Sequence, residues 1–137
     1  MKTSNFILRR VRFMPDTLEP GVLYVSEQYR TAQHLCACGC GAKIRTPLGS
    51  TEWTFTDTAG GPTLSPSIGN WQQACQSHYL IKGGRVRWVG KWTEKQIRAG
   101  RRQEHKRRQA YYDALYPPGI LQRIRRWLKS LFRRWNT

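Results

Sequence analysis

Short runs of apolar and β-prone residues recur in the first two thirds of the chain. Runs of about four to eight such residues, bounded by glycine, proline or aspartate, are typical of β-strands, and alternation of polar and apolar residues marks a half-buried strand. The runs occur at residues 6–13, 21–26, 32–36, 42–46, 51–56, 79–82 and 85–89, and residues 51–56 alternate polar and aromatic side chains. The last two flank Gly83-Gly84, a pair that favours a β-hairpin. The pattern therefore predicts a small antiparallel β-domain.

One segment within this region is constrained by proline and glycine. Residues 63–71 contain Pro66 and Gly69. Proline cannot donate a hydrogen bond to a neighbouring strand, and glycine weakens a strand interior. We therefore expect an ordered loop at residues 63–71.

The pattern changes after Trp92. Thr93 and Gln96 have the spacing of a capping box, which opens a helix, and Pro117-Pro118 would end that helix. From Gly119 onward, apolar residues recur at helical spacing and basic residues occupy the other face. We expect an α+β protein, with a zinc-stapled β-domain at residues 1–92 and a basic helical extension at residues 93–137.

Charge is concentrated in this extension. Residues 1–90 hold 10 lysines and arginines against 5 acidic residues, whereas residues 91–137 hold 14 against 3. Such a surface favours an anionic partner, which can be nucleic acid, a membrane surface or an acidic protein. Two simpler interpretations remain open: the apolar stripe packs on the body, or the charged helix is only solvated.

The chain shows no sign of export. Arg9, Arg10 and Arg12 interrupt the apolar core that a signal peptide would need, and no apolar run is long enough to span a membrane. We therefore expect a cytoplasmic protein. In that compartment, four cysteines favour a metal site over disulfides.

All four cysteines and two of the three histidines lie in two short segments, residues 34–41 and 75–78. Thiolates and imidazoles gathered in this way are typical of Zn²⁺ sites. The simplest ligand set is Cys36, Cys38, Cys40 and Cys75, and a set that replaces one thiolate with His78 is the alternative. Isolated buried cysteines are the bland interpretation. A metal held by four thiolates would be structural, because a catalytic zinc keeps one position open for water.

If cysteines fill the metal site, His34 and His78 remain beside it without a metal. Histidine is the usual general base near neutral pH. Ser67 or Ser77 could be the nucleophile of a serine-type hydrolase. The oxyanion donors would be Asn70 or loop N–H groups, and Asp57 or Glu52 would orient the histidine. The competing interpretation is that Ser67 caps a turn and His78 is a metal ligand.

Several motifs occur in order along the body. They include His34-Leu-Cys-Ala-Cys-Gly-Cys-Gly, Pro66-Ser-Ile-Gly-Asn-Trp and Cys75-Gln-Ser-His-Tyr. With these motifs, residues 21–88 resemble a small bacterial family of uncharacterised zinc-binding proteins encoded near ubiquitin-like conjugation genes, in antiphage settings. The resemblance implies a peptidase that processes or removes a ubiquitin-like protein. It also implies that protein, or its conjugation enzymes, as partners.

Two functions follow from these observations. The first is a zinc-binding peptidase of the serine type, a metallopeptidase being less favoured, that needs no small-molecule cofactor. The second is a zinc-binding adaptor without enzymatic activity, whose basic tail recruits an anionic partner. A serine within hydrogen-bond reach of a metal-free histidine favours the enzyme, and two metal-bound histidines favour the adaptor.

Overall fold

The computed structural model describes residues 1–116 and 119–135. In these residues the chain forms two four-stranded sheets followed by two helices, which confirms the α+β class. The elements are β1 (Ile7–Arg10), β2 (Val22–Ser26), β3 (Thr31–Leu35), β4 (Lys43–Pro47), β5 (Thr54–Thr58), β6 (Gly61–Gly69), β7 (His78–Lys82), β8 (Arg85–Trp88), α1 (Glu94–Leu115) and α2 (Ile120–Trp135).

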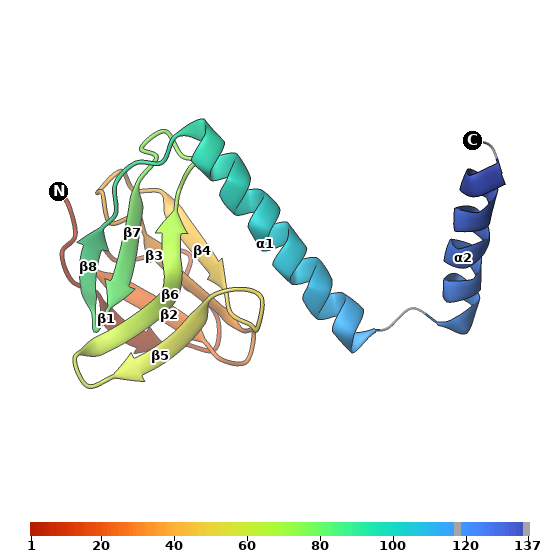
Figure 1. Ribbon diagram of the computed structural model, residues 1–137. Helices are drawn as coiled ribbons and strands as arrows, with labels where there is room; N and C mark the ends of the chain where they lie inside the picture. Colours follow the sequence, from red (N-terminus) through yellow and green to blue (C-terminus); the bar gives the residue numbers. More distant parts are fainter. Residues whose placement is uncertain (117–118, 136–137) are drawn as a thin grey trace. The chain divides into compact units, whose positions relative to one another are not determined.

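The two sheets follow the order of the strands in the chain. The first sheet is β1-β2-β3-β4 and the second is β5-β6-β7-β8 (Figure 1). All neighbours are antiparallel except β1 and β2, which are parallel. The segment before β1 connects the sheets, because Phe6 N–H donates to the Gly84 carbonyl (2.6 Å) and Val86 N–H donates to the Ser4 carbonyl (2.9 Å). The body is therefore one β-structure in which the N-terminal segment links the two sheets.

The predicted hairpin at Gly83-Gly84 is confirmed. It joins β7 to β8 with Lys82 opposite Arg85, and both glycines have positive φ, 57° and 76°. A turn with two positive φ values matches the twist of the strands that it joins. A Cβ atom on Gly84 would lie 2.9 Å from the Phe6 carbonyl oxygen, so this position requires glycine for space as well as for φ.

The prediction of a loop at residues 63–71 is wrong. Most of this segment belongs to β6, the nine-residue strand that pairs with β5 and β7. The irregularity signalled by Pro66 appears instead as a shift in register. Leu64 pairs with Ile81 and Ile68 pairs with Tyr79, so β6 carries two extra residues between these pairs. Such a bulge changes the direction of the side chains within it and is often found beside active sites.

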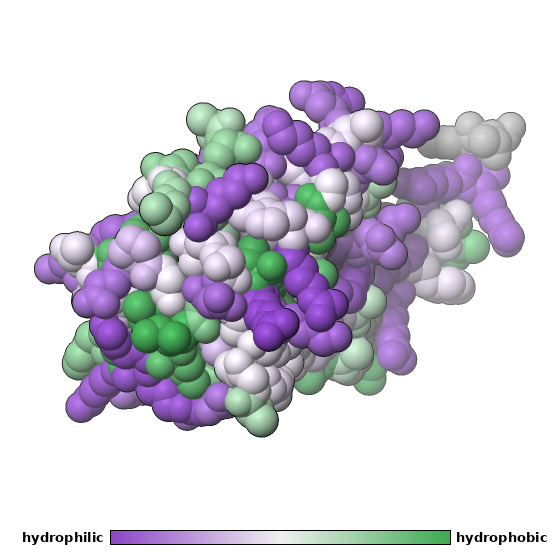
Figure 2. Space-filling model, turned by 90° about the vertical axis from the view of Figure 1, so that its left-hand side faces the viewer, coloured by the Kyte–Doolittle hydropathy of each residue, from purple (hydrophilic) through white to green (hydrophobic). Residues whose placement is uncertain are grey.

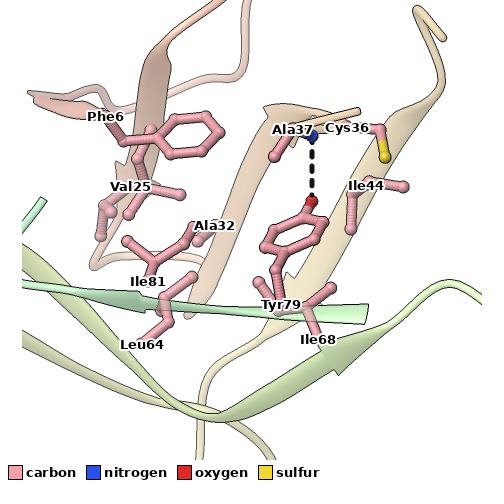
Figure 3. Packing of buried hydrophobic residues seen from close by; sticks show 11 residues of the cluster. Phe6, Val25, Ala32, Cys36, Ala37, Ile44, Leu64, Ile68, Tyr79 and Ile81 are labelled. Carbon is pink, nitrogen blue, oxygen red and sulfur yellow. Dashed lines mark hydrogen bonds between the residues drawn. The ribbon is translucent and has the colours of Figure 1, made fainter. Parts of the chain in front are cut away.

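The core lies between the two sheets. Leu23, Val25, Ala32 and Ile81 are fully buried, and Tyr79 is the largest fully buried side chain. Figure 3 shows Tyr79 among aliphatic side chains, with its hydroxyl directed at the backbone N–H of Ala37. This contact ties β7 to the segment that follows β3.

The Tyr79 hydroxyl also serves a buried histidine. His34 Nε2 lies 2.6 Å from the Tyr79 oxygen and Ala37 N lies 3.3 Å from it. Burial lowers the pKa of His34 to about 4, so the ring is neutral near pH 7. The hydroxyl can then donate to Nε2 and accept from Ala37 N–H. His34 is thus a core residue, held by a polar contact between the sheets.

We expect Tyr79→Phe to destabilise the body by about 1–3 kcal/mol, because it leaves His34 Nε2 and Ala37 N–H buried without this partner. Urea unfolding of both proteins measures the difference. Tyr29→Phe is the matched control, since Tyr29 is 52% exposed and should change stability by less than ~0.5 kcal/mol. Equal effects of the two substitutions would contradict this role of the hydroxyl.

Two compact units divide the chain, residues 1–97 and residues 98–137. The predicted start of the first helix is confirmed, because Thr93 N–H donates to Gln96 Oε1 (2.8 Å) and Gln96 N–H donates to Thr93 Oγ1 (3.2 Å). An independent domain at residues 93–137 stays a prediction. Pro117-Pro118 lies outside the described residues.

In the described residues, every side chain of α1 and α2 is at least partly exposed. Within the described residues, α1 and α2 contain no buried side chain, and neither has the length and apolar content needed to cross a membrane. On the body, the face that carries β8 mixes hydrophilic residues with small hydrophobic patches (Figure 2).

Candidate active site and metal centre

The four cysteines come together at one end of the body. Cys36 directly follows β3, Cys38 and Cys40 lie in the turn before β4, and Cys75 lies in the loop between β6 and β7. Their four Sγ atoms all lie within 4.8 Å of one another. The turn needs Gly39, which has a φ of 89° and whose Cβ would lie 2.5 Å from the Met1 carbonyl oxygen. Two distant segments of the chain thus meet through their sulfur atoms.

The sulfur positions suit a tetrahedral metal ion. Four Zn–S bonds of about 2.3 Å place neighbouring sulfur atoms about 3.8 Å apart. Cys36 Sγ lies 3.4 Å from Cys38 Sγ and 3.9 Å from Cys75 Sγ, and Cys40 Sγ lies 3.8 Å from Cys75 Sγ. All four cysteines are free of disulfides. The cluster could therefore hold a metal ion.

The environment of the cluster distinguishes its thiols. Burial raises the pKa of Cys36 to about 12. Burial also acts to raise the pKa of Cys75, but hydrogen bonds from Ser77 and neighbouring thiols outweigh it and lower that pKa to about 6. A bound cation would stabilise the thiolate form of Cys36, because a metal ion and a proton compete for the same sulfur atom.

Two of the residues expected in catalysis lie at the cysteine cluster. Ser77 Oγ is 2.9 Å from Cys36 Sγ and 3.1 Å from Cys75 Sγ. The Asn70 side-chain amide lies 3.6 Å from Cys36 Sγ and 3.5 Å from Ser77 Oγ. Both side chains are buried. Both side chains therefore contact the cysteine cluster and not the histidine.

The structure brings one predicted serine–histidine pair together. His78 Nε2 lies 2.8 Å from Ser67 Oγ. His78 is the first residue of β7, and Ser67 lies in the bulge of the adjacent strand β6. His78 is 4% exposed, whereas Ser67 is only half-buried. The bulge therefore presents a serine hydroxyl to a buried imidazole on the neighbouring strand.

A backbone carbonyl faces the other nitrogen of this imidazole. His78 Nδ1 lies 3.4 Å from the Gly90 carbonyl oxygen. A proton on Nδ1 directed at that oxygen leaves Nε2 free to accept a proton from Ser67. Asp57, one of the two carboxylates expected to orient the histidine, pairs with Arg10 instead.

Two tryptophans pack against His78, and neither was predicted as a site residue from the sequence. The ring centroids of Trp71 and Trp92 each lie 4.9 Å from that of His78, and the two indoles stack on each other at 5.8 Å. These aromatic contacts limit the movement of the imidazole. Trp71 belongs to the motif at residues 66–71, which also contains Ser67, so the sequence held a signal that it lies near the site. No sequence pattern indicated the same for Trp92.

The loop that carries Cys75 connects the cysteine cluster to the histidine. Asn70 N–H donates to the Ser77 carbonyl (2.8 Å), and Gln73 N–H donates to the Asn70 carbonyl (3.1 Å). His78 follows Ser77 directly in the chain. A metal bound to Cys75 would therefore also fix the backbone that positions His78.

Gly69 makes room for one of the tryptophans. A Cβ atom at this position would lie 2.5 Å from Trp71 Nε1 and 2.7 Å from Trp71 Cε2, so the indole would have to move. We expect Gly69→Ala to cost about 1–3 kcal/mol of stability and to reduce kcat/KM about tenfold or more, because Trp71 no longer confines His78.

Thermal unfolding and a peptidase assay together measure these effects. Gly49→Ala is the matched control, since the nearest atom to its Cβ would be Glu52 Cγ at 3.9 Å, an ordinary contact. Full activity of Gly69→Ala would show that Trp71 does not position the histidine.

Comparison with known proteins adds a family. Neither the curated proteins nor the solved structures include a match to this chain. Residues 10–89, more than half of the chain, match the family model described as "Bacterial ubiquitination-like system serine protease (BubE)". This range includes the cysteine cluster and both members of the serine–histidine pair. The chain therefore belongs to the BubE family, the serine proteases of bacterial ubiquitination-like systems.

Proposed function

We propose that this protein is a serine peptidase that processes or removes a bacterial ubiquitin-like protein, with Ser67 as nucleophile and His78 as general base. The hydrogen bond of 2.8 Å between Ser67 Oγ and His78 Nε2 carries the proposal. The description of the family as a serine protease supports it. The same hydrogen bond favours the enzyme over an adaptor, because it leaves His78 engaged with a hydroxyl rather than with a metal.

The chemistry follows that of other serine hydrolases. His78 Nε2 accepts the proton of Ser67 as its oxygen attacks the scissile carbonyl. The histidine then gives that proton to the leaving amine, and an acyl-serine remains. Water, activated by the same nitrogen, releases the ubiquitin-like product. The Gly90 carbonyl orients the imidazole, a role that a carboxylate has in many related sites.

The oxyanion that forms during the attack needs hydrogen-bond donors. The Asn70 amide is directed at Cys36 Sγ and Ser77 Oγ, so we assign this role to backbone N–H groups near Ser67 rather than to Asn70. Ser77 and His34 have no place in this mechanism, because one contacts sulfur atoms and the other lies in the core.

We assign the cysteine cluster to a structural Zn²⁺ held by Cys36, Cys38, Cys40 and Cys75. Four thiolates suit zinc and leave no open position for water, so the metal would stabilise the fold and take no part in the reaction. This ligand set supports a serine mechanism over a metallopeptidase.

A fluorophosphonate probe tests the nucleophile directly, since it reacts preferentially with an activated serine hydroxyl. We expect one adduct, mapped by peptide mass spectrometry to Ser67, on the purified full chain. Ser65→Ala is the matched control, because this exposed serine lies in the same bulge and its loss should leave the labelling intact.

The substrate is tested with the ubiquitin-like protein of the same conjugation system, fused through its C-terminus to a reporter. Cleavage at that junction, blocked by the probe, is the expected result. Tight binding of the fusion without cleavage, together with no labelling of Ser67, would replace the peptidase with the adaptor.

A further inference from the structure

The second helix has a surface that the peptidase mechanism does not use. Apolar side chains of α2 gather on one face and basic side chains on the other. At 3.6 residues per turn, the apolar positions cover an arc of about 140° and the basic positions cover most of the remainder. The apolar residues are Ile120, Leu121, Ile124, Trp127, Leu128, Leu131, Phe132 and Trp135, and the basic residues are Arg123, Arg125, Arg126, Lys129, Arg133 and Arg134.

We propose that α2 is an anchor that lies on a membrane surface rich in anionic lipids, with its apolar face among the acyl chains and its basic face at the headgroups. This inference goes beyond the proposed function, because it concerns where the peptidase acts. It also stands outside the family, since α2 lies beyond residues 10–89.

Several large apolar side chains of α2 are exposed. Trp127 is 60% exposed, Phe132 is 72% exposed and Trp135 is 88% exposed. Large apolar side chains in such numbers are costly in water, and a contiguous exposed patch is a mark of an interaction site. Tryptophan is enriched at the boundary between acyl chains and headgroups.

The basic face selects an anionic surface. α2 contains six arginines and lysines and no acidic residue over 16 residues. Each basic side chain near an anionic leaflet adds to the attraction, whereas zwitterionic lipids supply little of it. A helix of about 24 Å with this many charges lies along the surface and does not cross it.

A nucleic acid explains only half of this pattern. Phosphates would neutralise the basic face, but they would leave the apolar face in water. A lipid surface satisfies both faces at once, and so it is the occupant to which we commit.

Co-sedimentation of the full chain with lipid vesicles tests the proposal. We expect binding to vesicles of phosphatidylcholine and phosphatidylglycerol in a 3:1 ratio, and at least tenfold weaker binding to phosphatidylcholine alone. The triple variant R125Q/R126Q/K129Q should bind the anionic vesicles at least tenfold more weakly. The matched control R101Q/R102Q/K106Q removes the same charge from α1 and should lose less than threefold.

A second pair of variants tests the apolar face without a change of charge. W127Q/L128Q should weaken binding at least tenfold, whereas Y111Q/Y112Q, which alters exposed aromatic residues of α1, should not. Circular dichroism of each variant with vesicles reports whether the helix still forms. Equal losses for α1 and α2 variants would overturn the proposal. So would unchanged binding of W127Q/L128Q, or a strong preference for DNA over anionic vesicles.

Discussion

Ser67→Ala is expected to lower kcat/KM for the ubiquitin-like substrate by about 10³-fold or more, with little change in stability. The substitution removes one oxygen atom from the half-buried Ser67 side chain. That oxygen is hydrogen-bonded to His78 Nε2. The attacking atom is lost, while the strand pairing of β6 and the packing of His78 against the two indoles remain. Kinetics on a reporter fusion and a thermal melt of the same preparation give both quantities.

His78→Gln should give a loss of similar size, because the nucleophile and its base act as one unit and their effects do not add. The double variant should be no worse than either single variant by more than about tenfold. Ser65→Ala provides the contrast and should keep full activity, since this exposed serine lies in the same strand outside the serine–histidine pair. Activity above about one tenth of the parent in Ser67→Ala would remove this serine from the mechanism.

Removal of the metal is expected to have the largest effect on stability. The protein should purify with about one zinc per chain, and a chelator should lower its melting temperature by more than about 10 °C. The reason is that one ion would connect the turn after β3 to the loop before β7, two segments that lie 35–39 residues apart. Calorimetry with and without chelator measures the shift, and plasma mass spectrometry measures the zinc.

Cys75→Ser should reproduce the effect of the chelator and also abolish cleavage. Cys75 lies three residues before His78, so the loss of this ligand frees the backbone that positions the base. Ala74→Ser, at an exposed position in the same loop, is the control and should retain both zinc and activity. Metal-free protein with an unchanged melting curve would show that the cluster is not a staple.

These predictions depend on structural features, and the sequence alone predicts some of these features better than others. Strands such as β2 and β7 follow from short runs of apolar, β-prone residues, and the hairpin follows from Gly83-Gly84, because these signals are local. The four cysteines were predicted to form one cluster because they gather in two short segments of the sequence. The pairing of Ser67 with His78 was one of several possible serine–histidine combinations, since residues in neighbouring strands are close only once the register is known.

The bulge in β6 explains why the sequence alone could not predict this register. Pro66 and Gly69 locally indicate the end of a strand, whereas β6 accommodates them by a shift in register of two residues. The same shift brings Ser67 to His78. The positions of Asn70 and Ser77 at the sulfur atoms, and of Trp92 at the imidazole, depend on contacts between distant segments that no local pattern encodes.

Three consecutive residues at the start of β7 face three different environments. Ser77 contacts sulfur atoms, His78 contacts Ser67, and Tyr79 contacts His34 in the core. Because successive side chains of a strand point to opposite faces, the insertion or loss of one residue here would exchange all three assignments together. Members of the family should therefore keep a constant length between the last cysteine and this tyrosine, and should vary in length at the surface turns instead.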